Sequence, residues 1–506
     1  MTAIGTSSTV AVVGTGTMGQ GIAQVALVAG HRVRLYDTAP GRAEQAAGAI
    51  VGRLDRLVEK GRIAAAERDA ARERLSPAAD LAELADAAVV IEAILEQLPA
   101  KQELFAALED IVAADCLLAT NTSSLSVTAV AGRLRHPGRC VGLHFFNPAP
   151  LLPLVEVVSG FATDEAAATT AYDTAAAWGK TPVRCTDTPG FLVNRIARPF
   201  YAEALRAYEE RTADPATLDA LLRDGAGFKM GPFELTDLIG QDVNEAVTHS
   251  VWQAFFQDPK FTPSLAQRRL VESGLHGRKT GRGWFDYAEG ARRPEPRTEA
   301  PRPAPEAVVV HAELPGPAAE LPQLIEEAGI KVSRDRTPGE PQGCIRLPGG
   351  ACLALTDGRP ATSGAHGRCI RFDLSLDYRA ATRIALASSA ACSEEDLSEA
   401  IGLFQALGKQ VSVIEDVPGM IVARTIAMII DVAVDAAARG VASPEDIDTA
   451  MRLGVNYPGG PMEWLERLGA HWVWGLLDSL GHMGVGQRYV PCWALRRRAD
   501  LEEWVL

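Results

Sequence analysis

The hydrophobic pattern at the start of the chain predicts a strand, a helix and a second strand. Residues 10–13 are a β-branched apolar run, residues 20–29 have helical periodicity, and residues 32–36 alternate between polar and apolar side chains. A short apolar run followed by an amphipathic helix and another strand is typical of a parallel α/β sheet. We therefore expect the chain to begin with a βαβ unit.

The glycine-rich turn after the first strand predicts a dinucleotide site in a Rossmann fold. Gly14 permits the tight turn, Gly16 lets the backbone approach a pyrophosphate, and Gly19 lets helix and strand pack closely. The helix N-terminus offers its free N–H groups to the phosphates. Asp37 ends the second strand, where a carboxylate binds both ribose hydroxyls and repels a 2′-phosphate. NAD is therefore favoured over NADP, although the nearby Arg34 and Arg42 would attract such a phosphate.

Later apolar runs predict further strands of the same parallel sheet, at residues 87–91, 117–120, 140–143, 154–158 and 181–185. Ligands bind beyond the carboxyl ends of the strands in such sheets. Polar clusters follow three of these runs, at residues 92–101, 121–124 and 144–147. We expect these clusters to converge on one rim of the sheet.

His144 and Glu156 are the two titratable residues of an otherwise apolar stretch, residues 144–158. Histidine titrates near neutral pH, so a desolvated imidazole that a carboxylate orients is suited to take a proton from a substrate hydroxyl. The alternative is a core histidine and an unrelated surface glutamate. The polar clusters on the same rim favour the catalytic interpretation.

Six segments together resemble the L-3-hydroxyacyl-CoA dehydrogenases of the 3-hydroxybutyryl-CoA dehydrogenase type. They follow one another at family spacing: Gly14–Gln24, Glu92–Glu96 with Lys101, Asn121–Ser126, His144–Pro148, Pro189–Arg195 and Gly231–Gly240. The resemblance implies NAD-dependent oxidation of a (3S)-3-hydroxyacyl-CoA thioester to a 3-oxoacyl-CoA. The acyl chain stays open between 3-hydroxyadipyl-CoA, a substrate of phenylacetate breakdown, and 3-hydroxybutyryl-CoA, and the pathway is of the fatty-acid or phenylacetate type.

The same resemblance implies a role for each matched residue. His144 is the general base and Glu156 orients it, while Ser123 and Asn194 lie near the substrate hydroxyl and the thioester carbonyl. Asn147 supports the same substrate pocket. The residues implied to bind the cofactor are Gly14, Gly16, Thr17, Met18, Gly19, Asp37, Glu96, Lys101 and Asn121. Ser123 as a helix N-cap, and Asn194 as a helix cap, are the structural alternatives.

One constant offset in residue number maps parts of the second half of the chain onto the first. This repeat offset carries Pro189–Arg195 onto Pro418–Arg424 and Gly231–Glu234 onto Gly460–Glu463. The four site residues do not recur, because His144, Asn147, Glu156 and Asn194 fall on Asp373, Leu376, Ala385 and Ala423. Residues 307–335 also resemble the first βαβ unit, with Glu313 and Pro315 in place of the glycine turn. We therefore predict a truncated, degenerate repeat without a second NAD site.

These patterns divide the chain into an α/β domain and an all-α domain, followed by a degenerate version of both. The predicted segments are a Rossmann domain (1–187), a helical domain (188–290), a Pro-rich linker (291–306), a Rossmann-like domain (307–416) and a second helical domain (417–506). Such helical domains form the dimer interface in the two-domain family members that the chain resembles. The second helical domain then supplies that partner within one chain, as a monomeric pseudo-dimer. A homo-oligomer, or a regulatory or docking role for residues 307–506, is the alternative.

Composition excludes several classes of protein. The net charge is -14 and the basic residues are dispersed, which argues against nucleic acid or a membrane surface as a partner. The eight cysteines have no C-x-x-C spacing, so we expect no metal site and no disulfide framework. Without a signal sequence or a long apolar run, the expected location is cytoplasmic.

Two rival functions remain. A 3-hydroxyacid dehydrogenase of the 6-phosphogluconate type shares the glycine turn but relies on a lysine, and the spacing of His144 and Glu156 argues against it. A catalytically inactive NAD-binding structural or sensor protein of the same fold is the other rival.

Overall fold

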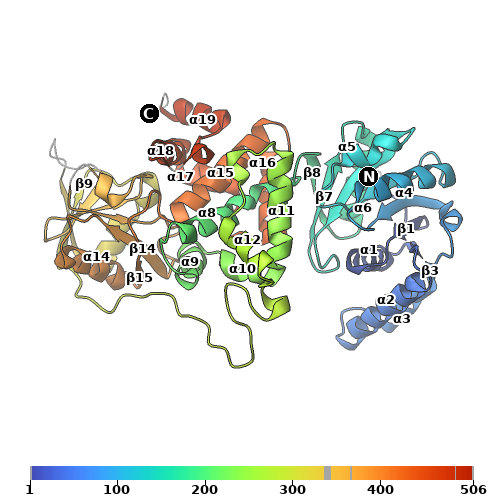
Figure 1. Ribbon diagram of the computed structural model, residues 1–506, viewed down its shortest axis with the longest axis horizontal. Coiled ribbons are helices and arrows are strands. Elements are labelled where there is room, and N and C mark those ends of the chain that lie inside the picture. Colours follow the sequence, from blue (N-terminus) through green and yellow to red (C-terminus); the bar gives the residue numbers. More distant parts are fainter. Residues whose placement is uncertain (1–2, 336–342, 365–366, 485, 504–506) are drawn as a thin grey trace. The chain divides into compact units, whose positions relative to one another are not determined.

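The computed structural model describes residues 3–335, 343–364, 367–484 and 486–503. The chain forms two compact units (Figure 1). The first comprises Met1–Val193 and Arg439–Val455, and the second Asn194–Ala438 and Asn456–Leu506. Across the described residues, no helix has the length and hydropathy needed to cross a membrane.

The first unit contains an eight-stranded sheet in the order β3-β2-β1-β4-β5-β6-β7-β8. Helices cover both faces, and each face has its own apolar core. The strands are β1 (Thr9–Val13), β2 (Arg32–Tyr36), β3 (Leu75–Pro77), β4 (Ala87–Glu92), β5 (Leu117–Thr120), β6 (Cys140–Phe145), β7 (Leu154–Ser159) and β8 (Thr181–Thr186). The helices are α1 (Thr17–Val28), α2 (Arg42–Glu59), α3 (Ala65–Glu73), α4 (Leu98–Ile111), α5 (Val127–Val130) and α6 (Glu165–Ala177).

All the predicted strands form, but the prediction that they are all parallel was wrong for the last two. β1 to β6 pair in parallel, whereas β7 is antiparallel to β6, and β8 then runs parallel to β7. The physical reason is the connection between β6 and β7, residues 146–153, which contains no helix. A parallel return needs a crossover of a dozen or more residues, so this short loop forces a reversal.

One helix from the second half of the sequence belongs to the first unit. α16 (Pro444–Val455) packs against β7 and β8. The Val441 carbonyl accepts a hydrogen bond from the Thr186 N–H at 2.9 Å, and Asp446 accepts one from the Arg184 N–H at 3.2 Å. The edge of the first sheet is therefore covered by a segment from far along the chain.

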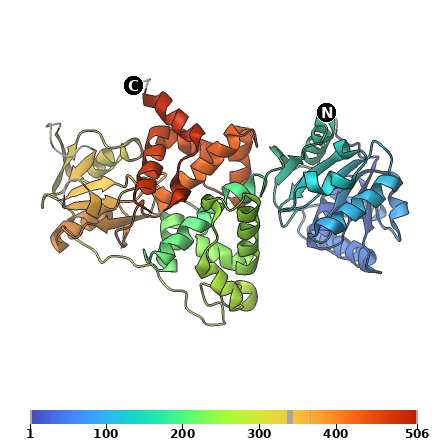
Figure 2. The ribbon, with the colours of Figure 1, turned by 45° about the horizontal axis from the view of Figure 1, so that its top comes forward.

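The second unit joins two sets of helices with one sheet. The first set comprises α8 (Arg198–Glu209), α9 (Pro215–Ala220), α10 (Pro232–Ile239), α11 (Gln241–Ala254) and α12 (Leu265–Glu272). The second comprises α15 (Val422–Ala438), α17 (Pro461–Leu468), α18 (Ala470–His482) and α19 (Trp493–Glu503). α8 and α15 lie side by side, and Figure 2 shows the green helices of the first set next to the orange and red helices of the second. Buried ion pairs cross this contact, including Glu203 with Arg424 at 3.2 Å.

The second sheet has the order β10-β9-β11-β12-β13-β14-β15. Its strands are β9 (Ala307–His311), β10 (Lys331–Asp335), β11 (Cys344–Arg346), β12 (Cys352–Leu355), β13 (Cys369–Phe372), β14 (Arg383–Ser388) and β15 (Gln410–Val413), and its helices are α13 (Leu321–Glu327) and α14 (Glu394–Ala406). The predicted Pro-rich linker, residues 291–306, has no helix or strand. It nevertheless lies against this sheet, because the Glu299 N–H donates to the Val411 carbonyl at 2.9 Å.

The repeat offset, which carries Pro189 onto Pro418, also relates secondary-structure elements to one another. It carries β7 onto β14, α6 onto α14 and α10 onto α17, each with the same first and last position. Unusual backbone conformations follow the same rule: Phe191 and Met420 both have positive φ, at 48° and 51°. A non-glycine residue with positive φ is uncommon, so its recurrence at matching positions is informative.

Candidate functional site

His144 and Glu156 form a buried pair on neighbouring strands of the first sheet. The antiparallel register places them directly opposite each other on β6 and β7. The Nδ1 atom of His144 lies 2.6 Å from Oε2 of Glu156. His144 is 6% exposed and Glu156 is fully buried. The pairing fixes the orientation of the imidazole, and it leaves Nε2 as the nitrogen that Glu156 does not contact.

Glu156 is itself held by the turn that precedes α7 (Val193–Ile196). Its Oε1 atom accepts hydrogen bonds from the backbone N–H groups of Leu192 and Val193, at 3.1 and 2.8 Å. The positive φ of Phe191 turns the chain so that these two donors converge on one oxygen. Both oxygens of the buried carboxylate therefore have partners, as a buried charge requires.

Two phenylalanines pack around the imidazole. The ring centroid of Phe146 lies 4.5 Å from that of His144, and the ring of Phe191 meets it edge-on at 5.9 Å. These apolar neighbours exclude water from most of the imidazole, and electrostatic interactions are stronger where water is excluded. The pair is therefore arranged as a base with a fixed tautomer in a dry environment.

The glycine turn between β1 and α1 forms a cradle that the protein itself leaves open. A Cβ atom on Gly14 would meet the Ala93 carbonyl oxygen at 2.5 Å, and one on Gly19 would meet the Gly14 oxygen at 1.8 Å. Tight packing thus explains both of these glycines. A Cβ atom on Gly16 would meet no protein atom within 4 Å, so packing does not explain it. Gly16 is the N-cap of α1, so no capping side chain covers the N–H groups at the start of this helix, where anions bind.

Asp37 lies beside this cradle and is preorganised as an acceptor. Its Oδ2 atom accepts from the N–H and hydroxyl of Thr15, at 2.9 and 2.6 Å. Burial tends to raise the pKa of Asp37, but these bonds outweigh it and the net pKa is lowered, so the carboxylate stays charged. Arg34 is engaged elsewhere, because it pairs with Asp86 at 3.0 Å. Arg42 also acts on Asp37, because its charge helps to lower the pKa of that carboxyl.

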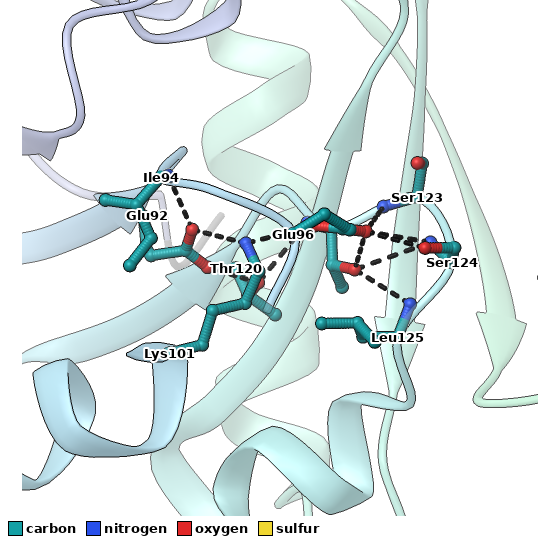
Figure 3. Close-up of polar contacts among 9 residues, drawn as sticks. Glu92, Ile94, Glu96, Lys101, Thr120, Ser123, Ser124 and Leu125 are labelled. Carbon is teal, nitrogen blue, oxygen red and sulfur yellow. Dashed lines mark hydrogen bonds and ion pairs between the residues drawn. The ribbon is translucent and has the colours of Figure 1, made fainter. Parts of the chain in front are cut away.

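Glu96 gathers the loop after β5 around its carboxylate (Figure 3). One of its oxygens accepts from the backbone N–H groups of Ser123 and Ser124, at 3.1 and 3.2 Å, and from the hydroxyl of Thr122. Burial tends to raise the pKa of Glu96, but the Thr122 hydrogen bond and the charge of Lys101 lower it further than burial raises it. Glu96 therefore holds, as an anion, the loop that carries Ser123.

Lys101 is enclosed between two carboxylates. It is 1% exposed, and its ammonium pairs with the fully buried Glu92 and, at 3.2 Å, with Glu96. Glu92 also accepts from the Thr120 hydroxyl at 2.7 Å and from the Ile94 N–H at 2.7 Å. Figure 3 shows the ammonium pointing between the two acids. Lys101 thus anchors Glu96 and presents no free charge of its own.

The remaining predicted residues occupy varied positions. Asn121 accepts from the Phe145 N–H at 2.9 Å, which ties the end of β5 to the residue after His144. Asn147 is exposed, and Ser123 is half-buried without a capping role, because Ser126 caps α5 instead. Asn194 follows Val193 in α7, where its carbonyl accepts from Arg198 at 2.8 Å. Thr17 and Met18 open α1.

Sequence reasoning assigned no role to three residues that build the site. Thr15 and Thr122 supply the hydroxyls that hold Asp37 and Glu96, and Glu92 neutralises Lys101. A signal for Glu92 was present, since an acid at the end of an apolar strand must find a partner when buried. The hydroxyls had no comparable signal, because threonine is common in turns.

Comparisons with known proteins agree along the whole chain. Residues 9–188 match the family model described as 3-hydroxyacyl-CoA dehydrogenase, NAD binding domain. The model of the C-terminal domain of the same family matches twice, at residues 190–287 and 419–504. Residues 353–418 match a model described as the 3-hydroxybutyryl-CoA dehydrogenase reduced Rossmann-fold domain.

Some relatives match nearly the whole chain, and others match about half of it. The chain is 44% identical over 494 residues to the 3-hydroxyadipyl-CoA dehydrogenase of Escherichia coli, a match that covers 98% of each chain. It is 40% identical over 280 residues to a 3-hydroxybutyryl-CoA dehydrogenase of Mycobacterium tuberculosis, covering 55% of this chain and 98% of that one. A crystal structure of a 3-hydroxybutyryl-CoA dehydrogenase from Escherichia coli K12 has a TM-score of 0.89 at 43% identity, covering 99% of this chain and 100% of that one.

Proposed function

The chain belongs to the 3-hydroxyacyl-CoA dehydrogenase family, and from that premise we propose that it oxidises (3S)-3-hydroxyacyl-CoA to 3-oxoacyl-CoA with NAD. The single observation that carries the proposal is the buried pair of His144 and Glu156, at 2.6 Å. A base oriented by a buried carboxylate is what removal of a hydroxyl proton near neutral pH requires. In this proposal His144 is the base that removes the proton.

His144 accepts the proton of the C3 hydroxyl on Nε2. Its Nδ1–H donates to Glu156, so the lone pair of the neutral ring is on Nε2. As the O–H bond breaks, its electrons form the C3 carbonyl, and the imidazolium that results is stabilised by the Glu156 carboxylate. The bound NAD supplies the acceptor for the hydride that leaves C3. In the reverse direction His144 returns the proton.

Ser123 and Asn194 act as neutral donors to the substrate oxygens, and Asn147 supports the same pocket. Neutral donors fix a hydroxyl or a thioester carbonyl without adding a charge that competes with His144. Glu96 keeps the Ser123 loop in place through its bonds to the Ser123 and Ser124 N–H groups.

The cradle and its rim would hold NAD. The open space above Gly16 would admit the pyrophosphate, next to the N–H groups at the start of α1. Asp37 would bind the adenosine ribose hydroxyls. Glu96 and Lys101, with Asn121, would lie near the nicotinamide ribose. The charge of Asp37 favours NAD over NADP.

The acyl group is that of 3-hydroxyadipyl-CoA, in a catabolic pathway of the phenylacetate type. The relative that matches this chain along 98% of both lengths carries that substrate in its name. 3-Hydroxybutyryl-CoA is the second candidate, because the solved structure with a TM-score of 0.89 is named for it. A comparison of kcat/KM for the two thioesters decides between them.

A direct test of the reaction follows NADH absorbance with acetoacetyl-CoA as the substrate. We expect consumption of NADH by the purified chain, and a loss of about 10³-fold or more in kcat for His144→Gln, with NADH affinity retained. Absence of turnover by the unmodified chain with every 3-oxoacyl-CoA would favour the inactive NAD-binding alternative. Near-normal turnover by His144→Gln would overturn the mechanism.

We further infer that residues 307–506 are a degenerate repeat of the first half. Asp373 stands at the position of His144 and accepts from the N–H groups of Ile421 and Val422, at 2.9 and 2.8 Å. These two donors match Leu192 and Val193, which bind Glu156 in the first half. In the second half, the Asp373 carboxylate therefore makes the contact that Glu156 makes in the first half. No histidine stands at the position of His144.

The same repeat supports a pseudo-dimer within one chain. In a two-fold interface, a contact between two residues recurs with their partners exchanged. A Cβ atom on Gly225 would lie 3.1 Å from the Arg383 carbonyl oxygen, and one on Gly454 would lie 2.7 Å from the Leu154 side chain. The repeat offset converts Gly225 into Gly454 and Leu154 into Arg383. Expression of residues 1–295 alone tests this idea: we expect an insoluble or self-associating product, and a soluble, fully active monomer would contradict it.

A further inference from the structure

We propose that Arg198 binds the distal carboxylate of 3-hydroxyacyl-CoA substrates whose acyl chain ends in an acid. This assignment rests on the proposed function and deepens it, because it names the group that separates a dicarboxylic acyl chain from a simple fatty acyl chain. Arg198 is the first residue of α8 and is 4% exposed. Arg198, Tyr201, Thr248 and Tyr457 all belong to the second unit.

Arg198 differs from the other buried arginines in its lack of an acidic partner. Five further arginines are buried in the described residues, and each lies within 4.0 Å of a carboxylate: Arg195, Arg371, Arg383, Arg424 and Arg488. Within the same described ranges no carboxylate lies within ion-pair distance of Arg198. A buried charge without a counter-ion is costly, so a missing anion is the natural partner.

The neutral contacts of Arg198 hold its guanidinium in one place. Nε donates to the Asn194 carbonyl at 2.8 Å, one terminal nitrogen donates to the Thr248 hydroxyl at 3.0 Å, and the group lies 4.9 Å from the centre of the Tyr201 ring. The two hydrogen bonds of Arg198 use its Nε–H and one of its terminal N–H groups. The planar guanidinium has five N–H donors and binds carboxylates with two of them at once, so donors remain for an acid.

Tyr457 supplies an unsatisfied hydroxyl close to Arg198. It is 7% exposed, and its hydroxyl has no hydrogen-bond partner among the residues that the structure describes. Burial lowers the pKa of Arg198, and the neighbouring Tyr201 and Tyr457 oppose that shift. A buried hydroxyl without a partner costs free energy. An incoming carboxylate would accept from both Tyr457 and Arg198.

Arg198 lies close to the residue that we place at the reacting end of the substrate. Asn194 precedes it by four residues, and the Asn194 carbonyl accepts from Nε of Arg198 at 2.8 Å. In a six-carbon chain, C3 and the distal carboxyl carbon are separated by three bonds of about 1.5 Å each, so a short dicarboxylic chain suits this spacing. Arg198, Tyr201 and Thr248 also line a cavity of about 30 Å³, and Glu209 and Arg488 belong to the same lining.

The second half of the chain supplies an internal control. The repeat offset carries Arg195 onto Arg424, and both arginines are buried and ion-paired. The same offset carries Arg198 onto Ala427 and Thr248 onto Leu477. The structural arginine is kept in both halves, whereas Arg198 is absent from the half that also lacks His144 and Asn194. Arg198 therefore follows the site residues and not the packing of the helices.

The test compares two thioesters of the same length, 3-hydroxyadipyl-CoA and 3-hydroxyhexanoyl-CoA, in the full chain with NAD. We expect Arg198→Met to lower kcat/KM for the adipyl substrate by about 100-fold or more and to change it by less than about 3-fold for the hexanoyl substrate. Arg198→Lys should recover part of the loss. Arg269→Met, which removes an exposed arginine of the same helical set, should leave the ratio of the two values unchanged.

Each result has one meaning for the assignment. An equal effect on both substrates, or no effect on either, would overturn the role of Arg198 while leaving the proposed reaction intact. Inactivity of the unmodified chain with both substrates would instead overturn the proposed function. If Arg198→Met does not fold, Tyr457→Phe decides: a selective loss of about 3- to 10-fold for the adipyl substrate supports the site, and an unselective result contradicts it.

Discussion

His144 and Glu156 are cross-strand neighbours on the antiparallel strands β6 and β7, with Nδ1 2.6 Å from Oε2. Directly opposed residues in an antiparallel pair have their Cβ atoms close together, so even short side chains can contact each other. The register of these two strands thereby fixes the distance between the imidazole and the carboxylate. Glu156 is further held by two N–H donors, which leaves the pair little freedom to separate.

The first prediction concerns the tautomer of His144. In Glu156→Gln the amide oxygen can still accept from the Leu192 and Val193 N–H groups, while the amide NH₂ donates to Nδ1. The proton then moves to Nε2, and the base is lost. We expect kcat to fall about 10³- to 10⁴-fold with little change in the thermal unfolding midpoint. Stopped-flow or steady-state turnover measures this, and a loss below about 10-fold would refute the orienting role.

The second prediction separates cofactor binding from folding in the glycine turn. Gly16→Ala adds a methyl group that meets no protein atom, so stability should be unchanged while the Kd for NADH rises by about 10-fold or more. Gly19→Ala is the matched control, because its methyl would meet the Gly14 oxygen at 1.8 Å. That variant should lose stability first. Fluorescence titration with NADH and thermal unfolding distinguish the two, and normal NADH affinity in Gly16→Ala would contradict the site.

The third prediction concerns the buried pair of Lys101 and Glu92. Lys101→Met removes the ammonium and leaves the fully buried Glu92 without a counter-ion. The free energy of unfolding should fall by about 3–5 kcal/mol, as measured by denaturant titration. Adding Glu92→Gln should restore part of this loss, since a neutral amide then replaces the fully buried carboxylate and only Glu96 remains charged. A double variant less stable than Lys101→Met would show that Glu92 stabilises the fold independently of Lys101.

The fourth prediction is a pH dependence that comes from Glu96. Its pKa in the folded chain lies below the ordinary value of 4.5, so the unfolded chain binds more protons in that range. The stabilisation is fully present above 4.5 and is lost as pH falls through the lowered pKa. The difference in unfolding midpoint between the unmodified chain and Glu96→Gln should therefore shrink between about pH 6 and about pH 3. A constant difference over that range would disprove the linkage.

The fifth prediction tests the structural role of the second half. Asp373→Ala removes the acceptor of four buried N–H groups, those of Leu374, Ile421, Val422 and Ala423. Each unpaired group costs about 1–3 kcal/mol, so the free energy of unfolding should fall by at least about 4 kcal/mol. Because Asp373 belongs to the half without a base, kcat of the folded fraction should stay within about 2-fold of normal. A selective loss of kcat at a temperature where the variant is folded would contradict this role.

Particular residues show how far sequence reasoning reached. The first βαβ unit was predicted from its pattern, and β2 ends where expected, at Tyr36 before Asp37. His144 and Glu156 were singled out before their contact was known, yet the sheet was predicted to be parallel at β7, which would not have placed them face to face. Lys101 was expected at the cofactor, but its burial between Glu92 and Glu96 followed from three segments that only the fold brings together.

The sequence by itself determined the local elements and the chemistry at the strand ends. Periodicity, glycine spacing and the repeat offset depend only on the order of residues along the chain, so they can be read from the sequence. Only the tertiary structure decided which groups neutralise one another. Glu156 meets His144, Glu92 encloses Lys101, and Arg198 lacks an acid among the described residues because strand direction and helix packing set distances between remote residues. Electrostatic energies depend on those distances and on burial, so they remain undetermined until the chain is folded.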